Sequence, residues 1–98
     1  MSEFLDLLAI YYTCDAMAAI RPLTSDEFQG CMDVYEVVKR YFAPDFDIAP
    51  VGTAERAEQM REAYLGFIGW QEANAELVAQ MRSTAAARLD IRQPTGFR

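Results

Sequence analysis

The side chains that could do chemistry in this sequence are few, and they do not assemble into a catalytic pattern. The chain has no histidine, which excludes imidazole bases, imidazole metal ligands and histidine-based pH switches. Asp15 falls on the most apolar side of an expected helix, but no second carboxylate at helical spacing joins it as an acid–base pair. An unpaired buried carboxylate is costly, so we expect Asp15 to pair with Lys39, Arg21 or an arginine of the third helix. We therefore expect no catalytic residue and no enzymatic activity.

Two further pairs of residues could bind a metal or react, and neither is convincing. Asp45 and Asp47 lack the additional ligand, the glycine and the distal glutamate of a calcium loop. Glycine-rich phosphate loops and zinc-ligand spacings are also absent from the sequence, so we expect no metal and no cofactor. Cys14 and Cys31 lie on apolar faces of adjacent helices, without a basic neighbour to lower a thiol pKa. We expect them to be buried small hydrophobic residues, although a disulfide between them would be a redox switch.

The composition describes a small acidic domain. The length of 98 residues is enough for a single domain. The chain carries a net charge of −6, and 52% of its residues are hydrophobic. Residues 1–55 hold ten acids and three bases, a balance of −7, which argues against direct binding to nucleic acid. Nothing resembles an export signal or a membrane span, and two cysteines are too few for a disulfide scaffold. We expect a cytoplasmic protein, and the preference for arginine over lysine favours a bacterial or phage origin.

The elements that position these side chains are helices. Apolar periodicity and capping signals predict helices at about residues 3–20, 25–42 and 54–89, followed by an irregular tail at 91–98. Ser2 caps the first helix, Thr24 and Glu27 form a capping box for the second, and Thr53 caps the third. In the second helix, Glu36 and Arg40 have the spacing of an ion pair. The predicted fold is all-α: an antiparallel helical hairpin and one long C-terminal helix within a single domain, 1–98.

The long third helix would reach beyond the hairpin. Its apolar positions follow heptad spacing, which predicts a self-association seam and a homodimer whose core is completed between subunits. The alternative architecture breaks this helix near Gly69–Asn74 and folds it back as a monomeric four-helix bundle. A strip of small residues, Gly66, Gly69 and Ala73, indicates either close helix packing or a hinge.

This helix also carries the residues that we expect to mediate association. Trp70 lies off the seam, and tryptophan and arginine are frequent anchors of protein interfaces. The first helix is too apolar to be exposed, which leaves the second half of the long helix as the candidate surface. The candidate interaction residues are Tyr64, Phe67, Trp70, Gln71, Asn74, Val78, Met81, Arg82 and Arg88.

The sequence favours a non-enzymatic protein that binds another protein, as an adaptor, inhibitor or assembly subunit. One alternative is an acidic inhibitor that competes with nucleic acid for a basic groove of its target. Its acidic stripe would consist of Asp26, Asp33, Glu36, Asp45 and Asp47. A second alternative is a small apolar ligand bound inside the helix bundle. That ligand would contact Tyr11, Tyr12, Tyr35, Tyr41 and Trp70.

Overall fold

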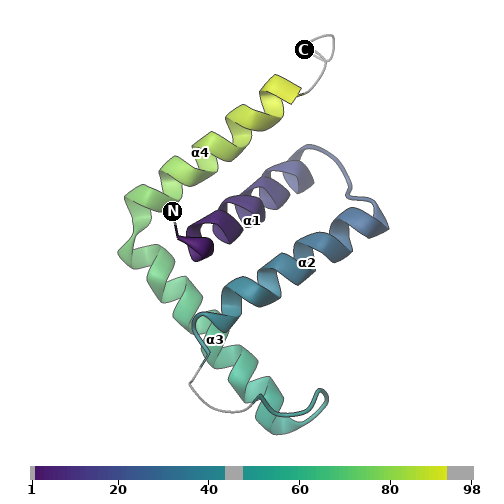
Figure 1. Ribbon diagram of the computed structural model, residues 1–98, viewed down its shortest axis with the longest axis vertical. Coiled ribbons are helices and arrows are strands. Elements are labelled where there is room, and N and C mark those ends of the chain that lie inside the picture. The colour runs from purple at the N-terminus through teal and green to yellow at the C-terminus, as the bar shows by residue number, and fades with distance from the viewer. Residues whose placement is uncertain (1, 44–47, 93–98) are drawn as a thin grey trace.

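The computed structural model describes residues 2–43 and 48–92, and this part of the chain is all-helical. It contains α1 (Glu3–Ile20), α2 (Ser25–Arg40), α3 (Ala54–Ala73) and α4 (Ala75–Arg92) (Figure 1). The first helix has the predicted bounds, and the second ends two residues earlier than predicted, at Arg40. Residues 93–98, most of the predicted irregular tail, lie outside the described residues.

The predicted helix starts are confirmed by their caps. The Ser2 side chain accepts a hydrogen bond from the Leu5 amide, and Thr53 does the same for Arg56. Thr24 and Glu27 form the full reciprocal capping box at the start of α2. One local prediction was wrong, because Glu36 pairs with Lys39 at 3.4 Å and not with Arg40.

The single helix predicted over 54–89 is instead two helices that meet at Asn74. This residue leaves helical geometry, with φ −122° and ψ 40°. Its side-chain amide donates to the Trp70 carbonyl at 2.8 Å, and its own carbonyl accepts from the Val78 amide at 3.0 Å. The backbone amide of Asn74 donates to the same Trp70 carbonyl at 3.0 Å, so the side chain adds a second bond at the end of α3, as asparagine side chains do where they compete with helical geometry. The break agrees with the alternative architecture, and the projecting helix of the first prediction is not present.

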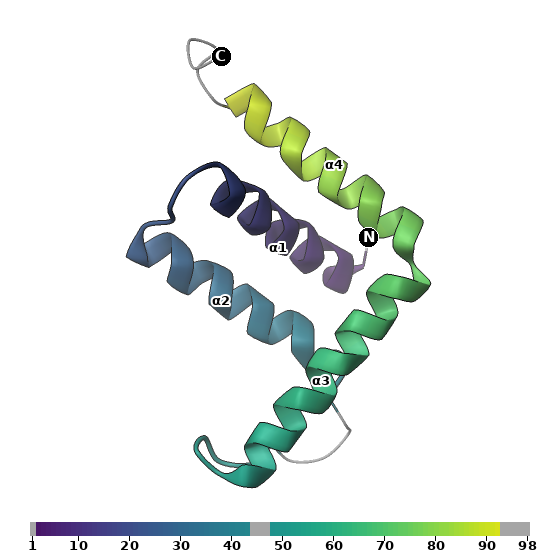
Figure 2. The ribbon, with the colours of Figure 1, turned by 180° about the vertical axis from the view of Figure 1, so that it is seen from behind.

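The break returns the chain to the hairpin. Helices α4, α1 and α2 lie side by side with α1 in the middle; α4 runs parallel to α1, and α2 runs antiparallel (Figure 1). Helix α3 is the crossover between α2 and α4 and crosses one face of this layer near the start of α1 (Figure 2). Parallel neighbours need such a crossover, whereas the α1–α2 hairpin needs only a short connection.

The core lies where α3 meets the layer. Leu8, Tyr12, Val38 and Phe67 are the largest fully buried side chains. Phe67 packs edge-on to Tyr11 at a ring-centroid distance of 5.7 Å. Each of the four helices contributes to this core, because Val78 and Ala85 of α4 belong to the same cluster.

A disulfide joins the two helices of the hairpin. Cys14 of α1 and Cys31 of α2 are bonded, with their Cα atoms 5.9 Å apart. The prediction of two unpaired, buried thiols was therefore wrong. The spacing alone could not reveal the bond, because it depends on the axial register of two antiparallel helices.

Candidate interaction surface

The three-helix layer has two different faces. On α1, Phe4, Tyr11 and Tyr12 contact α3 through Trp70, Phe67 and Gln71. Asp6, Ile10 and Thr13 lie about half a turn around α1 from those residues, at 100° per residue. We call this second side the open face, and it is the side toward the viewer in Figure 1.

The open face includes one row of residues from each helix of the layer. It consists of Asp6, Ile10 and Thr13 from α1, Gly30, Val34 and Val37 from α2, and Leu77, Met81, Thr84 and Arg88 from α4. Val37 follows Tyr35 by two residues and so lies on the side of α2 away from Phe67, which Tyr35 contacts. None of the contacts of α3 described above involves a residue of these rows.

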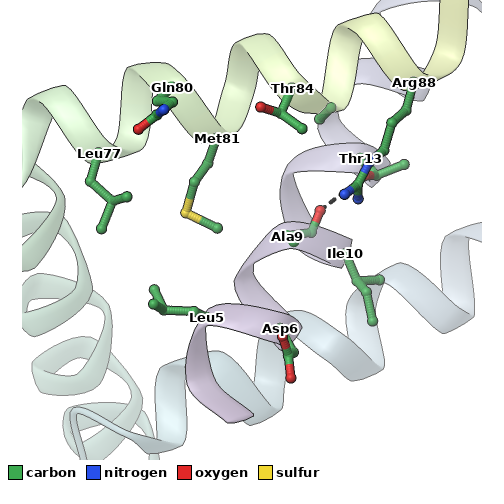
Figure 3. Close-up of a pocket in the computed structure, with 11 residues that line it drawn as sticks. Leu5, Asp6, Ala9, Ile10, Thr13, Leu77, Gln80, Met81, Thr84 and Arg88 are labelled. Atoms are coloured by element: carbon green, nitrogen blue, oxygen red, sulfur yellow. Dashed lines mark hydrogen bonds between the residues drawn. The ribbon is translucent and has the colours of Figure 1, made fainter. Parts of the chain in front are cut away.

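A groove of about 660 Å³ runs along the open face between α1 and α4. Leu77 and Met81 of α4 point toward Leu5 of α1 across its floor (Figure 3). At the other end, Arg88 extends from α4 toward Thr13, whose hydroxyl donates a hydrogen bond to the Ala9 carbonyl at 2.9 Å. The groove is thus apolar along its floor and carries a guanidinium at the end where the two helices finish.

Large apolar side chains on the open face remain in contact with solvent. Ile10 is 50% exposed and Val37 is 42% exposed. The expectation that the first helix is too apolar for exposure was therefore wrong for Ile10. The helix is apolar on all sides, but neighbours cover only the sides facing α2, α3 and α4.

A second, smaller depression of about 310 Å³ lies above the disulfide on the same side of the layer as α3. Its lining includes Tyr11, Phe28 and Met32. Phe28 is 56% exposed there. This depression has less than half the volume of the groove, and its walls come from α1, α2 and the connection between them.

Asp15 pairs with one of the three kinds of partner that the sequence left open, an arginine of the predicted third helix. The Arg82 guanidinium lies 3.4 Å from Asp15 and 4.5 Å from the centre of the Tyr12 ring. Both charged side chains are about half exposed, so the carboxylate stands at an edge and not in the core. Burial first, and then the nearby Asp15 charge, raise the pKa of Tyr11 from 10 to about 12.

Several predicted interaction residues are used inside the chain. Phe67 and Val78 are buried, and Trp70 packs edge-on to Phe4 at 5.1 Å. Gln71 accepts a hydrogen bond from the buried Tyr12 hydroxyl, and Asn74 forms the helix break. In the structure, these residues therefore belong to the packed interior or to the end of α3.

The other predicted residues are at the surface. Tyr64 is 44% exposed on α3, and Arg82 forms the ion pair with Asp15. Only Met81 and Arg88 lie on the open face. The heptad spacing could not separate them from the rest, because it assumed one continuous helix.

The structure also shows where several residues proposed for the two alternative functions lie. Asp26 and Asp33 are exposed on α2, whereas Asp45 and Asp47 lie outside the described residues. Of the aromatic residues proposed to bind a ligand, Tyr11 stacks on Tyr35 at 5.2 Å and also contacts Tyr12. The other two, Tyr41 and Trp70, pack on Phe4. Within the described part of the chain, no three metal-ligating side chains come together.

Comparison with protein-family models, with curated proteins and with solved structures found no match for this sequence. In addition, no helix among residues 2–43 and 48–92 is long and apolar enough to cross a membrane.

Proposed function

We propose that this protein is a non-enzymatic interaction module that binds another protein chain through its open face. The observation that carries this proposal is the exposure of two apolar side chains on the open face, Ile10 at the groove and Val37 on α2, across α1 from it. Contiguous apolar surface on a small domain is typical of interaction sites, whereas scattered single residues are not. A chain of this size also gains much of its stability from surface buried against a partner.

The shape of the open face suits a helical partner. Two parallel helices, α1 and α4, form a groove that extends for about three helical turns of α4, from Leu77 to Arg88, with the apolar Leu77 and Met81 on its floor. An amphipathic helix binds such a groove through apolar residues spaced three or four apart. Because α1 and α4 are parallel, their dipoles add, and a partner helix that runs antiparallel to both is favoured.

The disulfide changes the expected location. Few cysteines and no export signal favoured the cytoplasm, but disulfides persist in oxidising compartments and are rare in the cytosol. The cysteines therefore no longer support the expected cytoplasmic location.

The test is site-specific photo-crosslinking in cells that make the protein at its natural level. A photoreactive residue replaces Ile10 in one variant and Ser83 in a control variant. Ser83 is exposed and lies on the side of α4 turned away from α1 and from the groove. We expect one predominant crosslinked polypeptide from position 10 and none from position 83. Absence of a crosslink at position 10, or equal products at both positions, would contradict the proposal.

A further inference from the structure

We propose that the polypeptide bound by the open face is a second copy of this chain, related by a twofold axis parallel to α1. This inference rests on the proposed function, because it names the partner of the same face. The axis lies above the layer, displaced from α1 toward α2, and packs the two open faces together. Each copy then places its α2 in the α1–α4 groove of the other.

The directions of the helices fit this arrangement. Rotation about an axis parallel to the helices keeps every helix direction and reverses the lateral order of α4, α1 and α2. The antiparallel helix of one copy therefore lies over the two parallel helices of the other. This is the orientation that the combined dipoles of α1 and α4 favour.

The same rotation fixes the axial register, because positions along the axis do not change. The disulfide marks one common level on α1 and α2. Ile10 precedes Cys14 by four residues and Val37 follows Cys31 by six, so they lie about 6 Å and 9 Å from that level, at 1.5 Å per residue. Both are on the same side of it, since the helices are antiparallel. The exposed apolar residues of the two copies therefore lie at similar levels along the axis.

Charges match at the opposite end of the groove. Asp26 precedes Cys31 by five residues and so lies about 7.5 Å beyond the disulfide level. Arg88 extends from α4 toward Thr13, the residue before Cys14 (Figure 3), so its side chain lies at this end of the groove, close to the disulfide level. The twofold rotation thus brings Asp26 of each copy to the end of the groove that carries Arg88 of the other.

These two residues are available for such a contact. Both Asp26 and Arg88 are exposed. Within the part of the chain that the structure describes, neither belongs to an ion pair. The rotation also brings the exposed Arg40, the last residue of α2, to about the level of Asp6. The pattern is complementary at both ends of the interface.

Charge reversal with reciprocal rescue tests the arrangement. In the Arg88→Glu homodimer, Asp26 of each copy would meet a carboxylate, and in the Asp26→Lys homodimer, Arg88 of each copy would meet an ammonium group. Both variants alone therefore contain two repulsive contacts. The mixture of the two variants forms a heterodimer. In one of its contacts, the original Asp26 meets the original Arg88, and in the other, the lysine introduced at position 26 meets the glutamate introduced at position 88. Each acid then meets a base. Light scattering measures the mass in each sample, and circular dichroism confirms that each variant keeps its helices.

We expect the wild-type chain to be a dimer at tens of micromolar, and each variant alone to have a dimer Kd raised by at least about tenfold. Mixing the variants restores the dimer mass. Three results would contradict the proposal that the partner is a second copy of the chain. They are a wild-type chain that stays monomeric at these concentrations, single variants that remain dimeric, and a mixture that stays monomeric. Crosslinking from position 10 separates this failure from that of the proposed function: a different polypeptide overturns only the second copy, and no polypeptide overturns both.

Discussion

Gly66 of α3 lies against Phe42, which follows the end of α2, so closely that a Cβ at position 66 would come within 2.9 Å of the Phe42 Cβ. The position is what allows α3 to cross the layer at this point. Gly69, three residues later in the same helix, has nothing within 4 Å of the place where its Cβ would stand. The strip of small residues is therefore a close contact at one glycine and open surface at the other.

Substituting the two glycines should have opposite effects on stability. Gly66→Ala overpacks the contact with Phe42, and we expect a loss of about 1–3 kcal/mol in the free energy of unfolding. Gly69→Ala removes backbone freedom without a clash and should stabilise the protein by about 0.5–1 kcal/mol. Urea unfolding of both variants measures the difference. Equal effects of the two substitutions would show that α3 does not approach Phe42 closely.

Tyr12→Phe should cost more stability than Asp15→Asn. The phenolic hydroxyl of the buried Tyr12 donates to Gln71, and its removal leaves a partly buried amide oxygen unpaired, at a cost of about 1–2 kcal/mol. The Asp15–Arg82 pair is half exposed, so its loss should cost under about 1 kcal/mol. Thermal or urea unfolding gives both values. The reverse order would place the Asp15 pair, and not the Tyr12 hydroxyl, among the stabilising contacts.

The capping box predicts a specific dependence on pH. The Arg21 guanidinium, together with the Thr24 amide, lowers the pKa of Glu27 from 4.5 to about 2. Because the pKa is lower in the folded state, the stabilisation by Glu27 is complete above pH 4.5 and is lost as the pH falls toward 2. The difference in unfolding free energy between the wild type and Glu27→Gln should therefore shrink across that range. A difference that stays constant from about pH 6 to about pH 2 would contradict this role.

Reduction of the disulfide should destabilise the hairpin. The bond closes a loop with a sequence separation of 17 residues, for which chain entropy gives about 3 kcal/mol. We expect the free energy of unfolding to fall by about that amount in reductant. The double variant Cys14→Ala, Cys31→Ala should have the lower value in both conditions. A wild-type protein unaffected by reductant would mean that the bond contributes little.

The local elements could be predicted from the sequence because their signals are local. Ser2, Thr24 and Thr53 mark helix starts through side-chain hydrogen bonds within one turn, and all three caps are present. That Asp15 has a basic partner was also predictable, since a charge among apolar residues needs one, but the sequence left three candidates open and only the structure identifies Arg82.

The arrangement of the helices could not be predicted in the same way. Asn74 is compatible with a helix interior and with a helix end, and only the burial of Val78 and Ala85 against the hairpin favours the break. The disulfide and the open face both depend on which sides of α1 are covered. An all-round apolar helix does not reveal this, so the exposure of Ile10 was missed.

The most direct test of the open face as the contact surface compares Ile10→Arg with Ser83→Arg by light scattering. Both substitutions add the same charge at an exposed helical position, and only Ile10 lies on the open face. We expect Ile10→Arg to reduce the mass from that of a dimer to that of the 11.1 kDa chain, with unchanged helical content, while Ser83→Arg keeps the wild-type mass. Two variants with the same mass as the wild type would contradict the account.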